Sequence, residues 1–599
     1  MRPAGLSDIE KQVRTEFLEG RRTVFGDPAV DDPAQGASWG PERTLQAAFI
    51  RKLIEDAGER RAPLRLVGAR VIGALELEYL ELGYSLSFSN CYFADEIDLH
   101  DTRLRRLNLH GTHLAGLNAA MAHIDGSVVL HRVHATGQLR LDNAVIGGGL
   151  FLTEAVISHP GNVALRAERV QVAGDLAVGD TAIEGTTVLR DARLDGVLGL
   201  QRARLHAPGA EALDAARLYV GSDVLADELH AEGRIRFSGA QVAGLLRLAE
   251  AKLSNPGGTA LDAYQAKIGA DLQCYYGFEA DGLVRITGAR IEGHVRFDRA
   301  VIHGDGANAL DARYADIRGA ARCREMRATG AVRFANARIA NDLDFREAVL
   351  TFDPLSPVSS SGSLMTASRS GSLSPNLLFL GNLRAAELTL RFAAPPEGGI
   401  HLANAQVGVL NDDPAAWPAL LALDGFTYDR IAEPGSVAGR ISWLEREDGG
   451  YRPGPYEQLA SVYRRQGLEG EARRALLAKQ RARRRTLPIA ARQWGFVQDA
   501  AVGYGYRPER ALGWLAALLI TGTMVFGLHH PIASGPDQAP PFNPLIYTLD
   551  LLLPVINFGQ GRAYIATGGY QWIAYLLTAA GWILATTIAA GVARAVNRA

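Results

Sequence analysis

The sequence predicts a mainly β protein built around a parallel β-helix, a solenoid in which each repeat stacks on the next. Three observations support this fold class: short apolar–polar alternation, a glycine or asparagine at a fixed place between the alternating segments, and alanines that recur in one register. Alternation with a period of two residues is typical of short strands with one buried face. Such units cannot bury that face alone, so they stack into one continuous core.

The recurring alanines define the repeat. They are spaced by 48, 48, 49 and 48 residues, and a second alanine follows eleven residues after each one. A third marker, ALRA or ALDA, keeps the same spacing. Each repeat holds about six strand-like pieces, so we expect two coils of roughly 24 residues, each with three sides. The marker alanines are Ala144, Ala192, Ala240, Ala289 and Ala337.

One position between the two strands that flank each marker is a glycine or an asparagine. These residue types tolerate positive φ, so we expect tight corners with positive φ at Gly196, Gly244, Gly293 and Asn341. The alternation also predicts side chains that point inward and stack from coil to coil. These are Leu246, Leu248, Val295, Phe297, Leu343 and Phe345.

The same patterns indicate the domain organisation. The solenoid signal covers 62–430, and some fourteen coils at about 4.8 Å per strand make a rod on the order of 65 Å long. Segments 6–19 and 41–57 look helical, so 1–61 is expected to cap the first coil and shield its open edge. Residues 353–376 are rich in Ser, Gly and Pro and predict a flexible loop that leaves the solenoid and returns.

After the solenoid the period changes to that of helices. Residues 431–510 are expected to form a basic helical neck. Two apolar stretches follow within 511–599: the uncharged 511–528, with 18 residues, and 571–593, with 23 residues. A helix needs about 20 apolar residues to cross a bilayer, so both stretches predict transmembrane helices.

The arginine distribution predicts the topology. Arginines cluster before the first span and after the second, whereas the connecting segment 529–570 contains only Arg562. The positive-inside rule then places both termini and the solenoid on the cytoplasmic side of the cell membrane. The N-terminus lacks the apolar core of a secretory signal. The widely spaced Cys91, Cys274 and Cys323 match neither a zinc site nor a disulfide framework and fit a reducing compartment.

Four histidines form a candidate metal site. His110 and His131 are 21 residues apart, as are His113 and His134. Since 21 residues is close to one coil, each pair would stack in adjacent coils, where neutral imidazoles could bridge a metal. The alternative is that these histidines are polar surface residues.

Two further groups lie in the C-terminal part. Segment 543–561 is apolar around Asp550 and could re-enter the bilayer, lie at its surface or pack on the spans. A carboxylate near a membrane is costly and usually has a role, but it could also sit at headgroup level beside Asn543 or Arg562. The basic stretch of Arg481, Arg483, Arg484 and Arg485 suggests contact with anionic lipids, or a topology signal, or both.

The repeat units resemble pentapeptide-repeat-like β-helices. The tail, from ISWLER through PYEQLASVYRRQGLEGEARRALLAKQRARRR to NPLIYTLDLLLPVINFGQ, is similar to a group of actinobacterial membrane proteins that are often labelled membrane-associated oxidoreductases. The resemblance covers most of the chain and implies a membrane-bound β-helix, and its label implies an oxidoreductase. The sequence carries no motif for that chemistry: there is no GxGxxG between a strand and a helix and no CxxC. No cofactor is therefore expected.

Three functions stay open. We favour a membrane-tethered cytoplasmic scaffold whose solenoid binds a protein partner. The second is an oligomeric pore made of the two spans and 543–561, with Asn557, Gly559 and Gly561 in the place of a selectivity filter, although the potassium-type TVGYG is absent. The third is the oxidoreductase of the family label. The expected partners are the lipid bilayer, a protein and further copies of the chain. A net charge of −2 does not indicate a nucleic-acid-binding protein.

Overall fold

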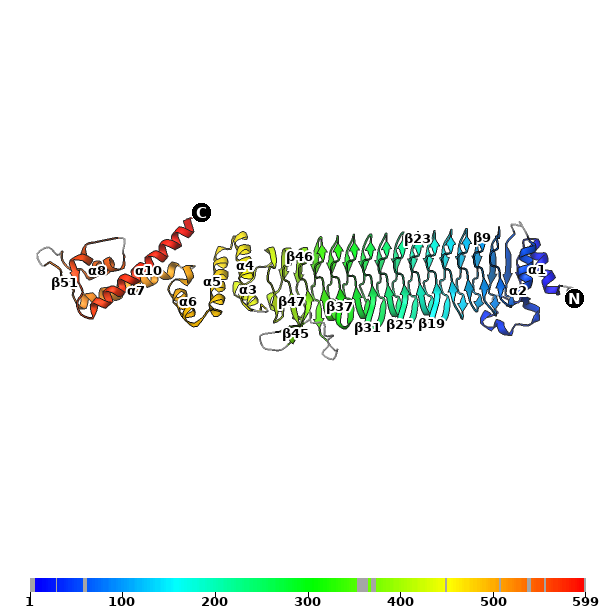
Figure 1. The fold of residues 1–599 in the computed structure, drawn as a ribbon, viewed down its shortest axis with the longest axis horizontal. Helices are drawn as coiled ribbons and strands as arrows, with labels where there is room; N and C mark the ends of the chain where they lie inside the picture. The colour runs from blue at the N-terminus through cyan, green and yellow to red at the C-terminus, as the bar shows by residue number, and fades with distance from the viewer. Residues whose placement is uncertain are drawn as a thin grey trace. The chain divides into compact units, whose positions relative to one another are not determined.

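The computed structural model describes residues 6–27, 30–57, 62–352, 365–367, 373–447, 450–505, 508–535, 540–553 and 556–596. The chain forms two compact units. The first is Met1–Pro434 with Arg446–Gly449, and the second is Gly435–Glu445 with Gly450–Ala599. The first unit contains the stacked strands and the second is mostly helical (Figure 1).

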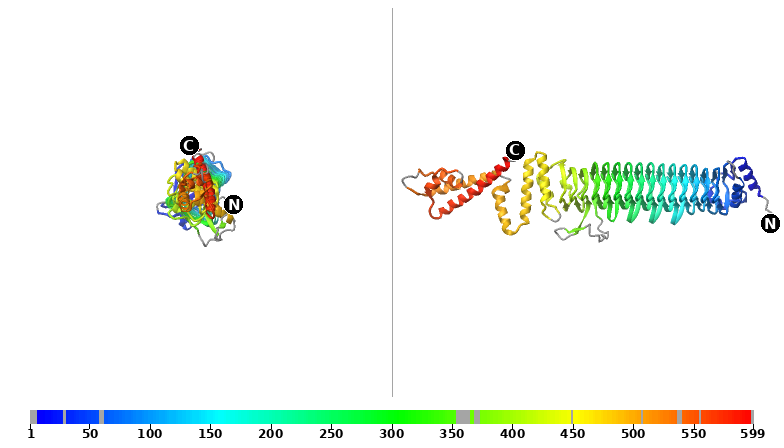
Figure 2. Two further views of the ribbon diagram at one scale, coloured as in Figure 1. Left: turned by 90° about the vertical axis from the view of Figure 1, so that its left-hand side faces the viewer. Right: turned by 45° about the horizontal axis from the view of Figure 1, so that its top comes forward.

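The first unit is a parallel β-solenoid of about 16 turns, which confirms the predicted mainly β fold. Its regular part runs from β3 (Leu64–Val67) to β50 (Thr427–Ile431), and nearly every strand pairs in parallel with the strands one coil before and one coil after it. At about 4.8 Å per turn the stack is about 75 Å long. The stack is therefore somewhat longer than the rod of about 65 Å expected from fourteen coils. Figures 1 and 2 show the stacked coils.

The coils alternate in length. Strands β20 (Gln171–Val172), β23 (Arg193–Leu194), β26 (Tyr219–Val220) and β29 (Gln241–Val242) lie directly on one another. Their first residues, 171, 193, 219 and 241, are 22, 26 and 22 residues apart. One 48-residue repeat is thus a coil of 26 residues and a coil of 22, so the prediction of two coils per repeat is confirmed.

Each coil has four sides, so the three-sided prediction is wrong. Two sides are short strands, such as β20 and β21 (Leu176–Ala177). In the first coils the other two sides are also separate short strands, and from β19 (Val156–Arg166) to β40 (Arg327–Arg333) they belong to one strand. One such strand, β22 (Ala182–Val188), pairs with β25 (Arg204–Asp214) in two segments on either side of a register shift. At the shift lies Gly185, with φ of 115°. The corner was missed because it falls inside a continuous strand.

The predicted corners exist, but their φ was wrong. Gly196, Gly244, Gly293 and Asn341 all lie at bends between two short strands, and none has positive φ. A Cβ at Gly196 would lie 2.7 Å from the carbonyl carbon of Gly174 in the coil before, so close approach of two backbones favours glycine there. Positive φ occurs instead at the residue before each marker alanine, as at Asn143 (55°) and Asp191 (57°).

The inward-facing set is confirmed. Leu246, Val295 and Leu343 lie in one column, in which Leu272 and Ala321 of the intervening coils separate them. Each of the six predicted side chains is at most 1% exposed: Leu246, Leu248, Val295, Phe297, Leu343 and Phe345. The core is therefore a continuous stack of aliphatic and aromatic layers.

The long coils carry a projecting arm. In β19 (Val156–Arg166), β25 and β31 (Lys252–Asp262), a Pro-Gly pair sits between the two paired segments, and the glycines Gly161, Gly209 and Gly257 have φ of 70° to 74°. Proline followed by a positive-φ glycine is typical of a type II turn. A Cβ at any of these glycines would meet nothing within 4 Å, so the arms reach into open space.

Helices and short strands precede the first full coil. Helix α1 (Asp8–Leu18) begins with a capping box between Ser7 and Glu10, and α2 (Ala47–Asp56) buries Ile50, Leu53 and Ile54. Within 41–57, which looked helical, strand β2 (Thr44–Gln46) pairs with β4 (Arg70–Ile72). Most of the predicted loop 353–376 lies outside the described residues, but β44 (Met365–Ala367) and β45 (Leu373–Phe379) pair in the antiparallel direction.

The described residues of the second unit form helices and one small β pair, β51 (Ile532–Ala533) with β52 (Tyr564–Ile565). A neck of four helices comes first: α3 (Val437–Leu444), α4 (Pro453–Arg465), α5 (Glu469–Arg485) and α6 (Ile489–Val502). After η4 (Gly503–Gly505) follow α7 (Pro508–Leu528), α8 (Pro544–Leu552), α9 (Gln560–Ala563) and α10 (Tyr570–Val596).

Among the described residues, one helical segment, Arg510–Leu528 of α7, is long and apolar enough to cross a membrane. Only 17% of its apolar window is buried within the structure. The core helix of a soluble protein would be mostly buried. The sequence predicted two spans, and this finding supports the first.

Candidate interaction surfaces

The predicted histidine pairs lie in adjacent coils. His113 of β11 (His113–Leu114) is the direct partner of His134 of β15 (His134–Ala135), and their ring centroids are 4.7 Å apart with planes at 11°. The rings of His110 and His131 are 5.1 Å apart at 23°. Tyr92 stacks on the other face of His113 at 5.3 Å. The surface of these coils thus carries a short ladder of stacked rings.

The stacking does not favour a bridging metal. Nearly parallel rings direct their in-plane lone pairs in parallel directions, whereas a shared ion needs both to converge at about 2.0–2.1 Å. Burial lowers the pKa of His110 and of His113, and the second ring of each pair lowers it further. No group of three His, Cys, Asp or Glu that could hold a metal ion occurs in the described part of the chain. A metal at the histidine pairs stays a prediction.

One side of the solenoid carries an alternating Asp–Arg ladder that sequence reasoning missed. From β25 to β40 (Arg327–Arg333), one outward position at the end of the paired segment is Asp in the longer coils and Arg in the shorter coils. The sequence pattern that could have predicted this ladder is the Asp of the ALDA motif alternating with the Arg of VRI and VRF, about 24 residues apart. The ladder runs Asp214, Arg236, Asp262, Arg285, Asp311, Arg333.

The acidic members of the ladder are paired with arginines. Arg285 donates two hydrogen bonds of 3.0 Å to Asp262, which is 2% exposed. Arg313 binds Asp311 at 2.7 and 2.9 Å. Burial raises the pKa of Asp311, but these bonds more than offset it, so the pKa lies below its ordinary value. Because the acidic members are already paired, the ladder stabilises the solenoid and leaves little negative charge for a ligand.

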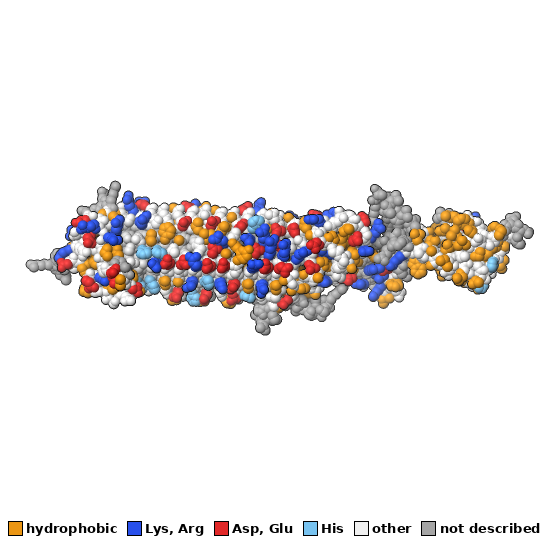
Figure 3. Space-filling model, turned by 180° about the vertical axis from the view of Figure 1, so that it is seen from behind, with side chains coloured by type: hydrophobic (Ala, Val, Ile, Leu, Met, Phe, Trp, Pro, Cys, Tyr) orange, Lys and Arg blue, Asp and Glu red, His pale blue; other side chains and the backbone are white. Residues whose placement is uncertain are grey.

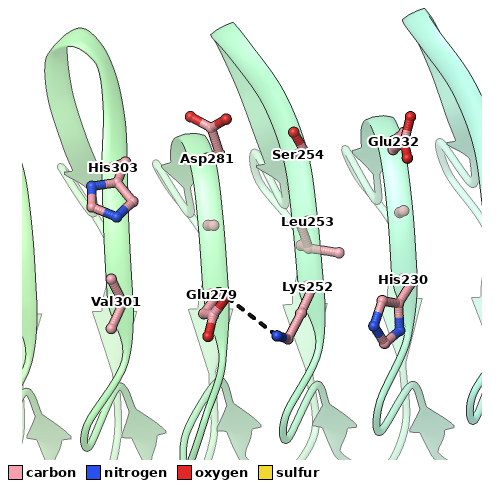
Figure 4. Close-up of a pocket in the computed structure, with 11 residues that line it drawn as sticks. His230, Glu232, Lys252, Leu253, Ser254, Glu279, Asp281, Val301 and His303 are labelled. Carbon is pink, nitrogen blue, oxygen red and sulfur yellow. Dashed lines mark ion pairs between the residues drawn. The ribbon is translucent and has the colours of Figure 1, made fainter.

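A trough on the neighbouring side is more open. It has a volume of about 490 Å³ and lies across β28 (His230–Arg236), β31, β34 (Glu279–Arg285) and β37 (Val301–Asp311). The 11-residue strands β31 and β37 are longer than the 7-residue β34 that lies between them. They therefore form a ridge on each side of β34. Figure 4 shows two rows of side chains along this surface, with Asp281, Ser254 and Glu232 in one and Glu279, Lys252 and His230 in the other.

The trough is acidic. Its carboxylates are Glu232, Glu279 and Asp281, and its one Lys or Arg is Lys252, whose Nζ lies 3.6 Å from Glu279. Glu232 pairs with His206 of the preceding strand at 2.9 Å. On the face shown in Figure 3, acidic and basic side chains cover much of the solenoid surface in rows, whereas many hydrophobic side chains cover the end of the helical unit.

The three cysteines are inert groups of the core. Cys91, Cys274 and Cys323 are each 0% exposed. Burial raises the pKa of Cys91 to about 12 and also raises the pKa of Cys274 and Cys323. Because redox and nucleophilic chemistry need the thiolate, these side chains are poor candidates for the activity that the family label implies.

The basic stretch at the end of α5 is largely used inside the helical unit. Arg481 donates two hydrogen bonds to Asp499 of α6, at 2.9 and 3.0 Å, and Arg484 donates a third at 3.2 Å. Arg485 pairs with Glu445 at 3.1 Å. Arg483 is exposed and has no ion pair among the described residues. Of the four arginines proposed to face lipid, Arg483 is therefore the most available.

The segment around Asp550 packs on α7 and α10. A Cβ at Gly522 of α7 would lie 2.4 Å from Thr548 Cγ2, and a Cβ at Gly581 of α10 would lie 2.3 Å from the carbonyl oxygen of Leu552. Helix α8 thus wedges between the two long helices where each has a glycine. Gly581 is eleven residues into α10, a depth of roughly 16 Å along the helix. The buried side chains around the wedge include Phe526, Tyr547, Leu552 and Leu577.

The structure brings the four pore candidates together in one turn. The Asp550 carboxylate accepts hydrogen bonds from the backbone N–H groups of Phe558 (2.5 Å) and Gly561 (2.8 Å). Asn557 Oδ1 accepts from the N–H of Gly559 at 2.8 Å, and Gly559 has φ of 90°. Asn543 caps α8 through its side chain and does not pair with Asp550. Asp550 therefore closes the loop that follows α8.

No family model, no curated protein and no solved structure matches this chain.

Proposed function

We propose that this protein is a membrane-tethered scaffold, anchored by α7 and α10, whose solenoid presents the ridged acidic trough to a basic segment of a protein partner. The observation that carries the proposal is the alternation of 26- and 22-residue coils, which places ridges on every second coil and an acidic floor between them. Solenoids typically bind through such extended, repetitive surfaces.

The anchor rests on the outer surfaces of two helices. In α7, Leu512 and Ile520 are 61% and 65% exposed, and in α10, Trp572 and Leu576 are 75% and 64% exposed. A water-soluble helix pair would turn such side chains inward. The 27 residues of α10 are long enough to span a bilayer with some tilt. The wedge of α8 then lies at membrane depth as a re-entrant segment whose backbone is covered by protein.

The proposed topology places the solenoid in the cytoplasm and the segment between α7 and α10 outside. A single engineered cysteine reports on each side, because the native cysteines are all 0% exposed. An impermeant thiol reagent on intact cells should label Ser534→Cys and leave Thr136→Cys, an exposed solenoid position, unlabelled until the cells are opened. Labelling of Thr136→Cys in intact cells would refute this orientation.

The partner side is tested by charge reversal in the trough. The double variant Asp281→Arg/Glu279→Arg should bind at least tenfold more weakly to the protein partners that cross-linking identifies in the same membranes. Asp195→Arg with Asp125→Arg, two exposed acids on another side of the solenoid, is the matched control and should keep the affinity. Equal binding by both double variants would remove the trough from the proposal.

A second candidate is a pore made by several copies of the helical unit. The observation that favours it is the order of a long helix, a short wedged helix, a glycine-containing turn and a second long helix. In this arrangement Asp550 holds the turn, and Asn557 and Gly559 would line the path. A tetramer in native mass analysis, together with an ion flux that is lost in Asp550→Ala, would support the pore. A monomer that conducts no ions would exclude it.

A further inference from the structure

Helix α6 carries an exposed face that combines apolar and basic side chains. Ile489 is 75% exposed and Phe496 is 65% exposed, and Leu487, just before the helix, is 37% exposed. Arg492 is also exposed. Residues 489, 492 and 496 are three and four positions apart, so their side chains lie on one side of the helix.

The opposite side of α6 is fixed against α5. Asp499 is 8% exposed and receives the hydrogen bonds of Arg481 and Arg484. Burial raises the pKa of Asp499, but the two guanidinium groups more than offset it, and the pKa lies below its ordinary value. At Gly495, a Cβ would come within 3.1 Å of Arg484 Cδ, so the helices approach closely. The helix cannot turn to bury Ile489 and Phe496 without breaking this contact.

The charge around this face is strongly positive. Between residues 481 and 502 the one acidic side chain is Asp499, which is already paired. Among the described residues, Arg483 and Arg492 are exposed and form no ion pair. The basic residues of this segment are Arg481, Arg483, Arg484, Arg485 and Arg492.

The position of α6 in the chain restricts where this face can be. Helix α6 ends at Val502, and the apolar segment of α7 begins at Arg510. Between them Tyr504 has φ of 54°, which ends α6 and redirects the chain. Eight peptide steps reach at most about 28 Å. If α7 crosses a bilayer, the C-terminal end of α6 lies within that distance of its surface.

We propose that α6 lies along the membrane surface, with Ile489 and Phe496 at the boundary between headgroups and acyl chains and with Arg483 and Arg492 against anionic headgroups. This inference rests on the proposed membrane anchor. A helix with an apolar face and flanking arginines binds the interface through buried apolar area and attraction to anionic lipid. The lipid surface matches the exposed face in both polarity and charge.

A single fluorescent probe tests the depth of α6. The full chain is labelled at Ile489→Cys, where the buried native cysteines do not compete, and reconstituted in vesicles of phosphatidylcholine with or without phosphatidylglycerol. We expect blue-shifted emission and at least threefold quenching by lipids that carry a spin label near the headgroup. Arg473→Cys, an exposed position on α5, is the matched control and should show neither effect.

The lipid charge gives a second readout. In Arg483→Glu with Arg492→Glu, the probe at residue 489 should lose at least half of the additional quenching that phosphatidylglycerol produces. Leu512→Cys, on the exposed side of α7, reports the anchor separately. Quenching at residue 512 without quenching at residue 489 would overturn the interfacial helix and leave the anchor standing. Absence of quenching at residue 512 would overturn both.

Discussion

In the solenoid, large apolar side chains face inward, and the surface between the corners carries paired Asp and Arg residues. In α7 and α10 the reverse holds: Ile520 and Trp572 are 65% and 75% exposed, and these helices carry few charges. Both units contain well-packed buried clusters, so the difference does not come from poor folding of one of them. It supports the proposed anchor, in which the solenoid faces water and α7 and α10 face an apolar medium.

The two units also use glycine for different purposes. In the short coils of the solenoid, glycines such as Gly282, with φ of 128°, form a corner inside a strand, and a Cβ there would lie 2.7 Å from the carbonyl oxygen of Asn255. In the helical unit, Gly522 and Gly581 have ordinary helical φ and instead leave room for α8. Glycine thus serves a backbone conformation in one unit and close helix packing in the other.

The largest effect is expected from a charge in the solenoid core. Phe297→Asp removes a side chain that is 0% exposed and places an unpaired carboxylate in the stack. It should lower the free energy of unfolding by about 4 kcal/mol or more. Chemical denaturation of the full chain in detergent, followed by the β signal in circular dichroism, measures it. An unchanged transition would show that Phe297 does not point inward.

The same type of change on α7 tests the apolar surroundings. Ile520→Asp should leave the solenoid transition unchanged but oppose membrane insertion by about 3 kcal/mol, because a carboxylate near the bilayer centre is costly. The fraction of protein that resists alkaline extraction from membranes should fall. Tyr314→Asp, at a solenoid position that is 63% exposed, is the control and should behave as wild type. Equal extraction of all three proteins would contradict the anchor.

A smaller effect is expected at the wedge. Gly581→Val places a side chain where even a Cβ would lie 2.3 Å from the carbonyl oxygen of Leu552, so α8 must move. Such overpacking costs about 2 kcal/mol. The matched control is Gly513→Val in α7, where a Cβ would meet nothing within 4 Å. Protease accessibility of the segment between α7 and α10 should rise in the first variant only, and a rise in both would indicate a general helix effect.

The smallest effect concerns the histidine ladder and pH. The folded pKa values of His110 and His113 lie below 6.5, their ordinary value, so the unfolded chain binds more protons just below that pH. Their contribution to stability is therefore complete above about pH 6.5 and is lost as the pH falls below it. His113→Gln should flatten the fall of the melting temperature between pH 7 and pH 5. An unchanged slope would mean that the ladder does not titrate in this range.

The repeat length, the inward side chains and the parallel stacking were predictable because all three are periodic in the sequence. Leu246, Val295 and Leu343 could be placed in one column from alanine spacing alone. The candidate surfaces were less accessible. The trough lies beside the arm at Pro256-Gly257. This Pro-Gly pair recurs at Pro160-Gly161 and Pro208-Gly209, a few residues after each aligned segment, and was not recognised as a turn.

By itself the sequence determined that this chain is a stack of short strands followed by apolar helices, since alternation, spacing and hydropathy act locally and repeat. The tertiary structure decided the rest. It showed four sides where three were expected, because the extra corner lies within a strand at Gly185 and its homologues in later repeats. It also showed that Arg481 and Arg484 hold Asp499, and that Asp550 closes a turn. Such pairings join residues from separate elements, and no local pattern specifies which charges meet.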